Sequence, residues 1–153
     1  MLAALSLPLR PQTNLQSLSC VVHVVAPEKI VVAKRDQLLT ADFVIQVKSG
    51  YHVNSNTPSD EYLIPLRLTF NEDVVKVQEV VYPKPEMEKF QFSTKPVSVF
   101  QGDIKTQAKF RVAASAPKGL SHLIGKLRYQ ACNDRACLPP RTLEVKEEIL
   151  RRY

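Results

Sequence analysis

The clearest indication of the fold class comes from residues 39–48, Leu39-Thr40-Ala41-Asp42-Phe43-Val44-Ile45-Gln46-Val47-Lys48. Its apolar residues Ala41, Phe43, Ile45 and Val47 fall on one face of an extended chain, while Thr40, Asp42, Gln46 and Lys48 fall on the other. A period of two with β-branched and aromatic residues is typical of a half-buried β-strand. The stretch therefore predicts a strand that packs one face against a core.

The same alternation recurs along the chain. It is found in residues 66–70, 107–112, 123–130 and 143–146. Residues 21–25 and 30–32 predict a first strand broken by Pro27, which favours a sheet edge, and residues 74–81 form another apolar run. About eight short strands at this spacing predict an all-β fold, a single antiparallel β-sandwich domain of immunoglobulin-like type.

The length of 153 residues suits one domain. We expect residues 1–18 to form a flexible N-terminal tail and residues 19–153 to form the sandwich. The first ten residues lack the basic start of a secretory signal peptide and contain Pro8, so they do not make a complete signal. No apolar run approaches the roughly 18 residues of a membrane-spanning helix, and we expect no direct membrane insertion of this chain.

The net charge of +6 raises the question of nucleic-acid binding. The basic residues are dispersed, however, and most alternate with apolar residues, as on the solvated faces of strands. No cluster combines basic and aromatic side chains in the way that base stacking requires. The charge therefore predicts a solvated surface, with no nucleic-acid partner.

Two segments do not fit the strand pattern. Residues 51–65 are rich in Asn, Ser and Pro, and residues 82–98 hold three prolines around Phe90 and Phe92. We expect both to be long loops. Long loops inside a compact domain are usually functional.

The strongest local signal is Tyr129-Gln130-Ala131-Cys132-Asn133-Asp134-Arg135-Ala136-Cys137-Leu138-Pro139-Pro140. Because both flanks read as strands, we expect a hairpin-like turn with the two cysteines facing each other. Facing residues of antiparallel strands have Cα atoms about 4.5–5.5 Å apart, and a disulfide accepts about 4.4–6.8 Å. The prolines after Cys137 cannot donate ladder hydrogen bonds, which predicts an accessible edge there.

Spacing alone leaves more than one role open for this pair. A structural bridge across a short loop would stabilise the fold by on the order of 2 kcal/mol, and a reversible redox pair needs the same geometry. A zinc site would need two further ligands, and His23, His52 and His122 are scattered singly, so we expect no metal and no cofactor. Cys20, far away in sequence, is expected to enter the first strand as a buried or free thiol.

The segment 129–140 resembles the signature of the amino-terminal domain family of the thiol:disulfide interchange protein DsbD, with Tyr-Gln-x-Cys, a short insert and Cys-x-Pro-Pro. The stretch Gly50-Tyr51-His52-Val53-Asn54-Ser55-Asn56-Thr57-Pro58, followed by Asp60-Glu61-Tyr62-Leu63-Ile64-Pro65, is similar to a second block of that family. The resemblance covers residues 20 to 149.

The resemblance implies an immunoglobulin-like fold and a periplasmic module that reduces oxidised thioredoxin-like partners through a transient mixed disulfide, as a protein-disulfide reductase component. It implies that Cys137 bonds to the partner and that Cys132 resolves this bond. Phe90 or Phe92 would supply an aromatic cap loop over the cysteines, and His52, Asn54 and Tyr129 are expected near the site. The alternative is a non-catalytic extracytoplasmic binding domain with a structural disulfide.

Overall fold

The computed structural model describes residues 20–27, 30–34, 36–71 and 75–152. The predicted tail of residues 1–18 and Val74 lie outside the described residues, so the expected tail is not tested. Within the described part of the chain every regular element is a β-strand, as predicted from the period-two pattern. None of the described residues belongs to a helix that could span a membrane.

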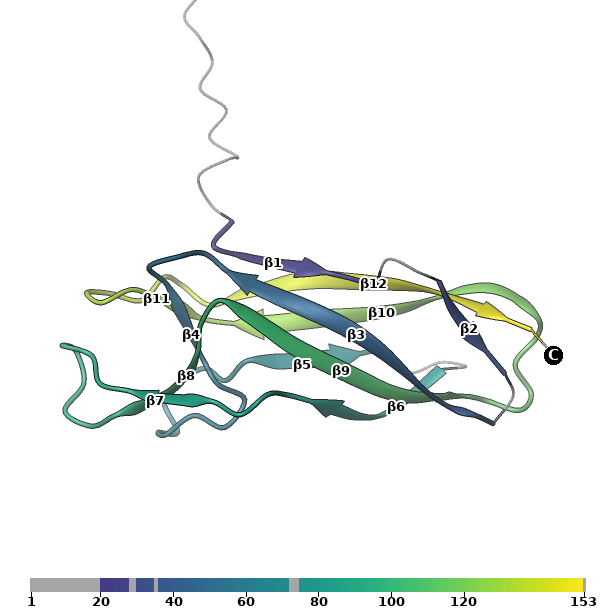
Figure 1. Cartoon of the computed structure of the whole chain (residues 1–153), viewed down its shortest axis with the longest axis horizontal. Coiled ribbons are helices and arrows are strands. Elements are labelled where there is room, and N and C mark those ends of the chain that lie inside the picture. The colour runs from purple at the N-terminus through teal and green to yellow at the C-terminus, as the bar shows by residue number, and fades with distance from the viewer. Residues whose placement is uncertain (1–19, 28–29, 35, 72–74, 153) are drawn as a thin grey trace, which may run out of the picture.

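The strands form three hydrogen-bonded sheets (Figure 1). In the first, the order is β1 (Val22–Val25), β3 (Leu38–Val47), β9 (Asp103–Val112) and β6 (Val75–Val81). In the second it is β2 (Val31–Ala33), β12 (Arg141–Arg151), β10 (Gly119–Tyr129) and β5 (Arg67–Phe70). In the third it is β11 (Ala131–Cys132), β4 (His52–Asn54), β8 (Val97–Phe100) and β7 (Glu86–Glu88).

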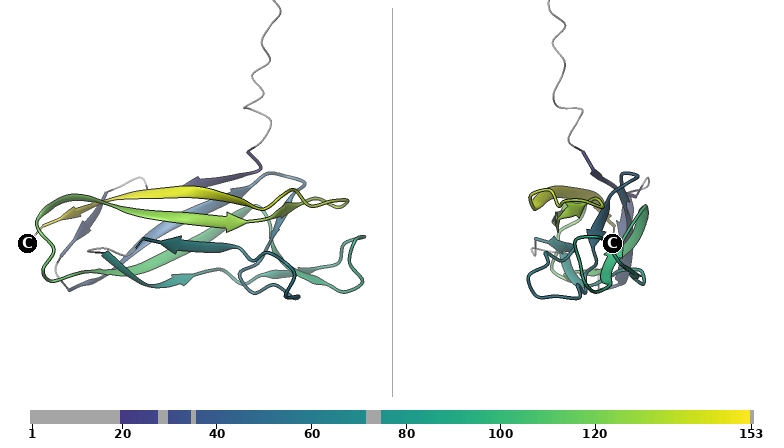
Figure 2. Two further views of the ribbon diagram at one scale, coloured as in Figure 1. Left: turned by 180° about the vertical axis from the view of Figure 1, so that it is seen from behind. Right: turned by 90° about the vertical axis from the view of Figure 1, so that its left-hand side faces the viewer.

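The first two sheets are the layers of an immunoglobulin-like sandwich, and the long strands run along the molecule (Figures 1 and 2). Phe43, Ile45 and Phe110 point between the layers and are fully buried, as the alternation in residues 39–48 and 107–112 predicted. The pairs are antiparallel apart from β2 with β12, which is parallel. The broken first strand is confirmed: β1 pairs with β3 in one layer and β2 pairs with β12 in the other.

Gly125 shows why the β5–β10 pair requires a residue without a side chain. It lies opposite Phe70, and a Cβ atom at this position would come 2.6 Å from the Phe70 ring and 2.7 Å from the carbonyl oxygen of Thr69. Such contacts are far below van der Waals separation. The glycine therefore lets the aromatic ring lie directly over the neighbouring strand.

Two expectations about loops were wrong. Residues 51–65 were expected to be entirely loop, but β4 lies within them, and residues 82–98 contain β7 and the start of β8. These strands have only three or four residues, and β4 and β8 are buried at every position, so neither shows polar–apolar alternation. Together with β11, the strands β4, β7 and β8 form the third sheet, at the end of the sandwich opposite the C-terminus (Figure 1).

Candidate functional site

Cys132 ends β11, and a disulfide joins it to Cys137. The two residues form an antiparallel bridge with their Cα atoms 3.9 Å apart. The hydrogen bonds that flank the bridge run from the Leu138 N–H to the Ala131 carbonyl (2.8 Å) and from the Asn133 N–H to the Ala136 carbonyl (2.9 Å). The facing arrangement across a turn is confirmed. The cysteines occupy a non-hydrogen-bonded pair, the closer of the two antiparallel positions, and their Cα separation is shorter still than the about 4.5 Å expected for such a pair.

The turn between the cysteines is held by the side chain of Asn133. Its Oδ1 atom accepts hydrogen bonds from the backbone N–H groups of Arg135 and Ala136, both at 2.9 Å. This is the Asx-turn geometry that asparagine favours, because its short side chain reaches the backbone two residues ahead. The turn therefore brings the two cysteines together through its own local hydrogen bonds.

The two sulfur-bearing residues differ sharply in exposure. Cys132 is 2% exposed, whereas Cys137 is exposed, as are Leu138, Pro139 and Pro140 after it. The chain after Cys137 forms no strand until Arg141, in line with the expectation drawn from the two prolines. An incoming thiol or disulfide can thus reach Cys137 while Cys132 stays covered.

His52 and Asn54 lie on the face of β4 that points away from the main core. Val53 between them belongs to the main core, while His52 stacks on Phe90 with ring centroids 4.0 Å apart. Asn54 is buried and donates from Nδ2 to the carbonyl of Ile64, which fastens the loop after β4. Both residues therefore lie on one face of β4.

His52 is paired directly with Cys132 in the β4–β11 register. Opposite residues of an antiparallel pair project to the same face, with Cβ atoms about 4.5–5.5 Å apart. Burial lowers the pKa of His52, and the carboxylate of Asp134 opposes this shift. The buried Cys132 side chain therefore lies on the same face of the sheet as a buried imidazole whose lowered pKa favours its neutral form.

Phe90 and Phe92 lie in the segment between β7 and β8 and form a stack over His52. Their rings are 5.2 Å apart and almost parallel, and the Phe92 ring lies 6.2 Å from His52. Phe90 is 8% exposed and Phe92 is 44% exposed. Phe90 is thus the inner ring of the stack and Phe92 the outer one.

Phe90 is also part of a small second core. It consists of Phe90, Val97 and Val99, with Leu63 packed against it. A hollow of about 300 Å³ opens beside it, and its wall includes Cys137, Phe92, Leu63 and Tyr62. The exposed cysteine therefore borders a partly apolar recess.

Tyr129 and Cys20 lie apart from this second core. Tyr129 packs into the main core at the end of β10, and burial raises the pKa of its phenol. Cys20 is a free, exposed thiol, and it precedes β1, so it does not enter the first strand as expected. Tyr129 was expected near the cysteines, and its side chain packs into the main core of the sandwich.

Several residues around Cys137 were not singled out as site residues from the sequence. Leu63 and Tyr62 line the recess from the loop after β4, and Gln130 donates to the Leu138 carbonyl at 3.2 Å. The block Asp60–Pro65 was noticed only for its similarity to a family pattern. Nothing in its own sequence shows that the loop folds back onto the cysteine turn.

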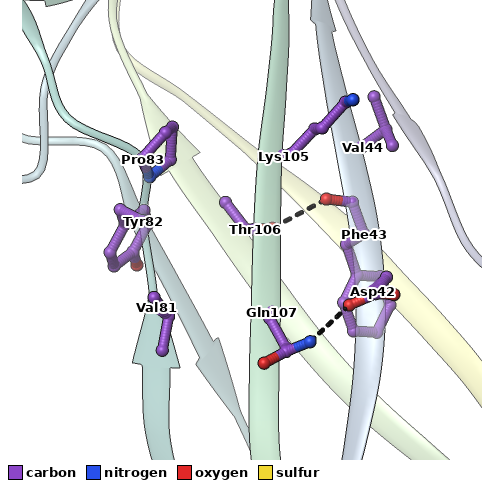
Figure 3. Close-up of a pocket in the computed structure, with 9 residues that line it drawn as sticks. All are labelled: Asp42, Phe43, Val44, Val81, Tyr82, Pro83, Lys105, Thr106 and Gln107. Atoms are coloured by element: carbon purple, nitrogen blue, oxygen red, sulfur yellow. Dashed lines mark hydrogen bonds between the residues drawn. The ribbon is translucent and has the colours of Figure 1, made fainter.

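A larger hollow of about 460 Å³ lies on the first sheet, between β3, β9 and the end of β6 (Figure 3). Two of its polar side chains are already used, since Gln107 donates to Asp42 at 2.8 Å and Thr106 donates to the Phe43 carbonyl at 2.9 Å. It holds no cysteine or histidine. We therefore interpret this hollow as a surface feature of the sheet, and the cysteine turn remains the candidate site.

Comparisons with known proteins identify the family of the chain. No protein with a curated description matches the chain. Among solved structures, the N-terminal domain of DsbD from Neisseria meningitidis in its reduced form is 16% identical with a TM-score of 0.47, and the match covers 69% of this chain and 74% of that one.

The N-terminal periplasmic domain of ScsB from Proteus mirabilis is 11% identical with a TM-score of 0.52 over 82% of this chain. The match spans 44% of that ScsB chain, and this likeness supports the sandwich fold alone. The family model described as "Thiol:disulfide interchange protein DsbD, N-terminal" matches residues 22–148. This range contains both cysteines of the bridge, the His52 strand and the aromatic stack. The chain therefore belongs to the family of DsbD N-terminal domains, a family of thiol:disulfide interchange proteins.

Proposed function

We propose that this domain passes electrons to oxidised thioredoxin-like proteins through the Cys132/Cys137 pair, as a component of a protein-disulfide reductase system in the periplasm. The observation that carries the proposal is the difference between the cysteines, one exposed beside a recess and one buried. Family membership and the bridge between the two residues support it.

In the proposed reaction the dithiol form reacts in two steps. The Cys137 thiolate attacks one sulfur of the partner disulfide and forms a mixed disulfide, and the other partner sulfur leaves as a thiolate. Cys132 then loses its proton, attacks Cys137 and releases the second partner thiolate. Two electrons move to the partner, and the Cys132–Cys137 bond is formed.

The accessible geometry favours this order of attack. Cys137 can be approached from solvent and from the recess lined by Leu63 and Phe92, whereas Cys132 is covered. A partner would meet Cys137 first, and Cys132 is held within bonding distance for the second step. The rings of Phe90 and Phe92 would act as a cap that shields the pair until the partner docks.

The second candidate is a non-catalytic extracytoplasmic binding domain whose disulfide is structural. The disulfide across the turn supports this candidate, because a bridge that closes a short loop also stabilises the folded state. The two candidates differ in reduction potential, because structural bridges in secreted proteins typically lie below about −300 mV and exchangeable ones above it.

The test is trapping in a Cys20→Ser background, which removes the free thiol. Reduced Cys132→Ser protein is mixed with oxidised thioredoxin, and the mixture is alkylated at once to cap the partner's second thiol before it can reverse the reaction. We expect a mixed disulfide on a non-reducing gel that disappears with dithiothreitol. Cys137→Ser is the matched control and should trap nothing. A potential well below −300 mV together with no adduct from Cys132→Ser would refute the exchange function in favour of the structural bridge.

A further inference from the structure

His52 carries a buried polar atom with no partner. Its side chain is 3% exposed, and Nε2 is one of the buried side-chain atoms that make no hydrogen bond within the described part of the chain. Leaving such a group unpaired costs about 1–3 kcal/mol. Buried polar atoms are nearly always satisfied, so this one requires a reason.

The strand register places His52 opposite Cys132. Because paired residues project to the same face, the imidazole and the Cys132 side chain are neighbours on that face. Stacking on Phe90 at 4.0 Å and 14° fixes the plane of the imidazole. The ring is thus held beside the buried member of the cysteine pair.

The structure holds the pair in its oxidised state, in which neither sulfur carries a proton. A disulfide offers an imidazole nitrogen no donor, whereas a thiol does. We propose that His52 Nε2 is the acceptor for the Cys132 thiol proton, as a hydrogen-bond partner in the dithiol and as the base in the resolving step. This role rests on the proposed exchange function.

In the proposed resolving step, the S–H bond of Cys132 breaks and its proton moves to His52 Nε2, while the Cys132 sulfur forms a bond to the Cys137 sulfur. The bond between Cys137 and the partner sulfur breaks, and the partner leaves as a thiolate with the electron pair. The imidazolium then returns its proton to the partner thiolate or to water.

The charges around His52 favour the neutral ring that this step needs. Burial lowers the pKa of His52 below 6.5, and the charge that opposes this is that of Asp134 in the cysteine turn. The other charged residues on the segments packed against it are Arg135 in that turn, Glu86 and Glu88 on β7, Lys89 next to Phe90, and Lys95 before β8. β8, which pairs with β4, carries no charged residue. At pH 7 the ring is therefore mainly neutral, with a lone pair free to accept a proton.

The experiment uses reduced protein in the Cys20→Ser background and one equivalent of dithiobis(nitrobenzoate), which releases a coloured thiolate. The first release reports attack by Cys137, and the second reports closure of the bridge by Cys132. With His52 present, we expect the second release to be nearly independent of pH from 7 to 9. In His52→Phe it should be at least about tenfold slower at pH 7 and should rise about tenfold per pH unit toward the ordinary thiol pKa of about 8.5.

His52→Phe keeps a flat ring for stacking on Phe90 but removes both nitrogens, and His52→Gln serves if the phenylalanine variant does not fold. His23→Gln, on an exposed position of β1, is the control and should behave like the parent. Unchanged closure rates and an unchanged pH profile in a folded His52 variant would overturn the proposal while leaving the exchange function intact. A parent protein that releases no second equivalent would overturn the exchange function and this role with it.

Discussion

Phe90 and Phe92 are separated by one residue but occupy different places in the stack over His52. Phe90 contacts the imidazole face, while Phe92 covers Phe90 and borders the recess at Cys137. The sequence could not decide which ring caps the cysteines. The structure places both rings in a single stack, so the cap is proposed to be shared.

Replacing either ring by alanine tests the cap. We expect Phe90→Ala and Phe92→Ala to speed the oxidation of the reduced pair by hydrogen peroxide severalfold, because each change uncovers part of the cysteine face. The rate is followed by the loss of titratable thiols in the Cys20→Ser background. Met87→Ala, an exposed position on β7, is the control. Unchanged oxidation rates in both phenylalanine variants would discard the cap.

Glu147 is a buried carboxyl group on β12, and burial raises its pKa to about 7, with the neighbouring Glu148 adding to the shift. The folded state therefore holds this proton at pH values where the unfolded chain, with a pKa near 4.5, has released it. The free energy of unfolding contributed by this group is thus full below pH 4.5 and falls as the pH rises to about 7.

Glu147→Gln should remove this pH dependence. We expect the variant to be more stable than the parent at pH 8 by on the order of 2 kcal/mol, and to differ little at pH 4.5. Urea unfolding at the two pH values measures the difference. Glu144→Gln, an exposed position on the same strand, should leave the pH profile unchanged. Equal stability of parent and Glu147→Gln at pH 8 would contradict the assignment.

At the scale of the element, the cysteine turn depends on the side chain of Asn133. Asn133→Ala removes the acceptor of two backbone hydrogen bonds, so the cysteines should meet less often in the reduced state. If this costs on the order of 1 kcal/mol, the reduction potential should become less negative by about 20 mV. Equilibration with glutathione measures the potential.

Asn133→Asp is the matched variant, because it keeps an acceptor oxygen at the same position. We expect it to restore most of the turn and most of the parent potential. A potential in Asn133→Ala that equals that of the parent would show that the flanking strands alone hold the cysteines together.

At the scale of the whole molecule, we expect the hydrophobic core to supply most of the stability of the sandwich and the Cys132–Cys137 disulfide to supply little. The buried core is formed by the long strands β3, β9, β10 and β12, and the bridge closes a loop with a sequence separation of only 5 residues. Such a short loop gives a stabilisation on the order of 2 kcal/mol. We therefore expect the fold to persist when the bridge is absent.

The double variant Cys132→Ser with Cys137→Ser should consequently stay folded. We expect its melting temperature to fall by roughly 5–10 °C, as measured by circular dichroism or calorimetry. The parent measured with and without reductant should show a similar difference. Loss of the folded state on reduction would instead favour the second candidate, a domain with a structural bridge.

The fold class and the importance of the cysteine pair could be predicted from local sequence patterns. Alternation in residues 39–48 and 107–112 depends only on the local two-residue period of a strand, and it correctly predicted which side chains enter the core. The facing of Cys132 and Cys137 is likewise local, because the four residues between them can close only a tight turn.

The residues around the cysteine pair are brought together by the tertiary structure alone. β4, β8 and β11 are too short or too uniformly buried for a periodic signal, so the third sheet could not be predicted. The placement of His52 beside Cys132 and beneath Phe90 joins segments about 40 and 80 residues apart in sequence, and it depends on strand pairings with no local signature. The sequence supplied the two cysteines, and the pairing of distant strands decided which one is buried and which imidazole lies next to it.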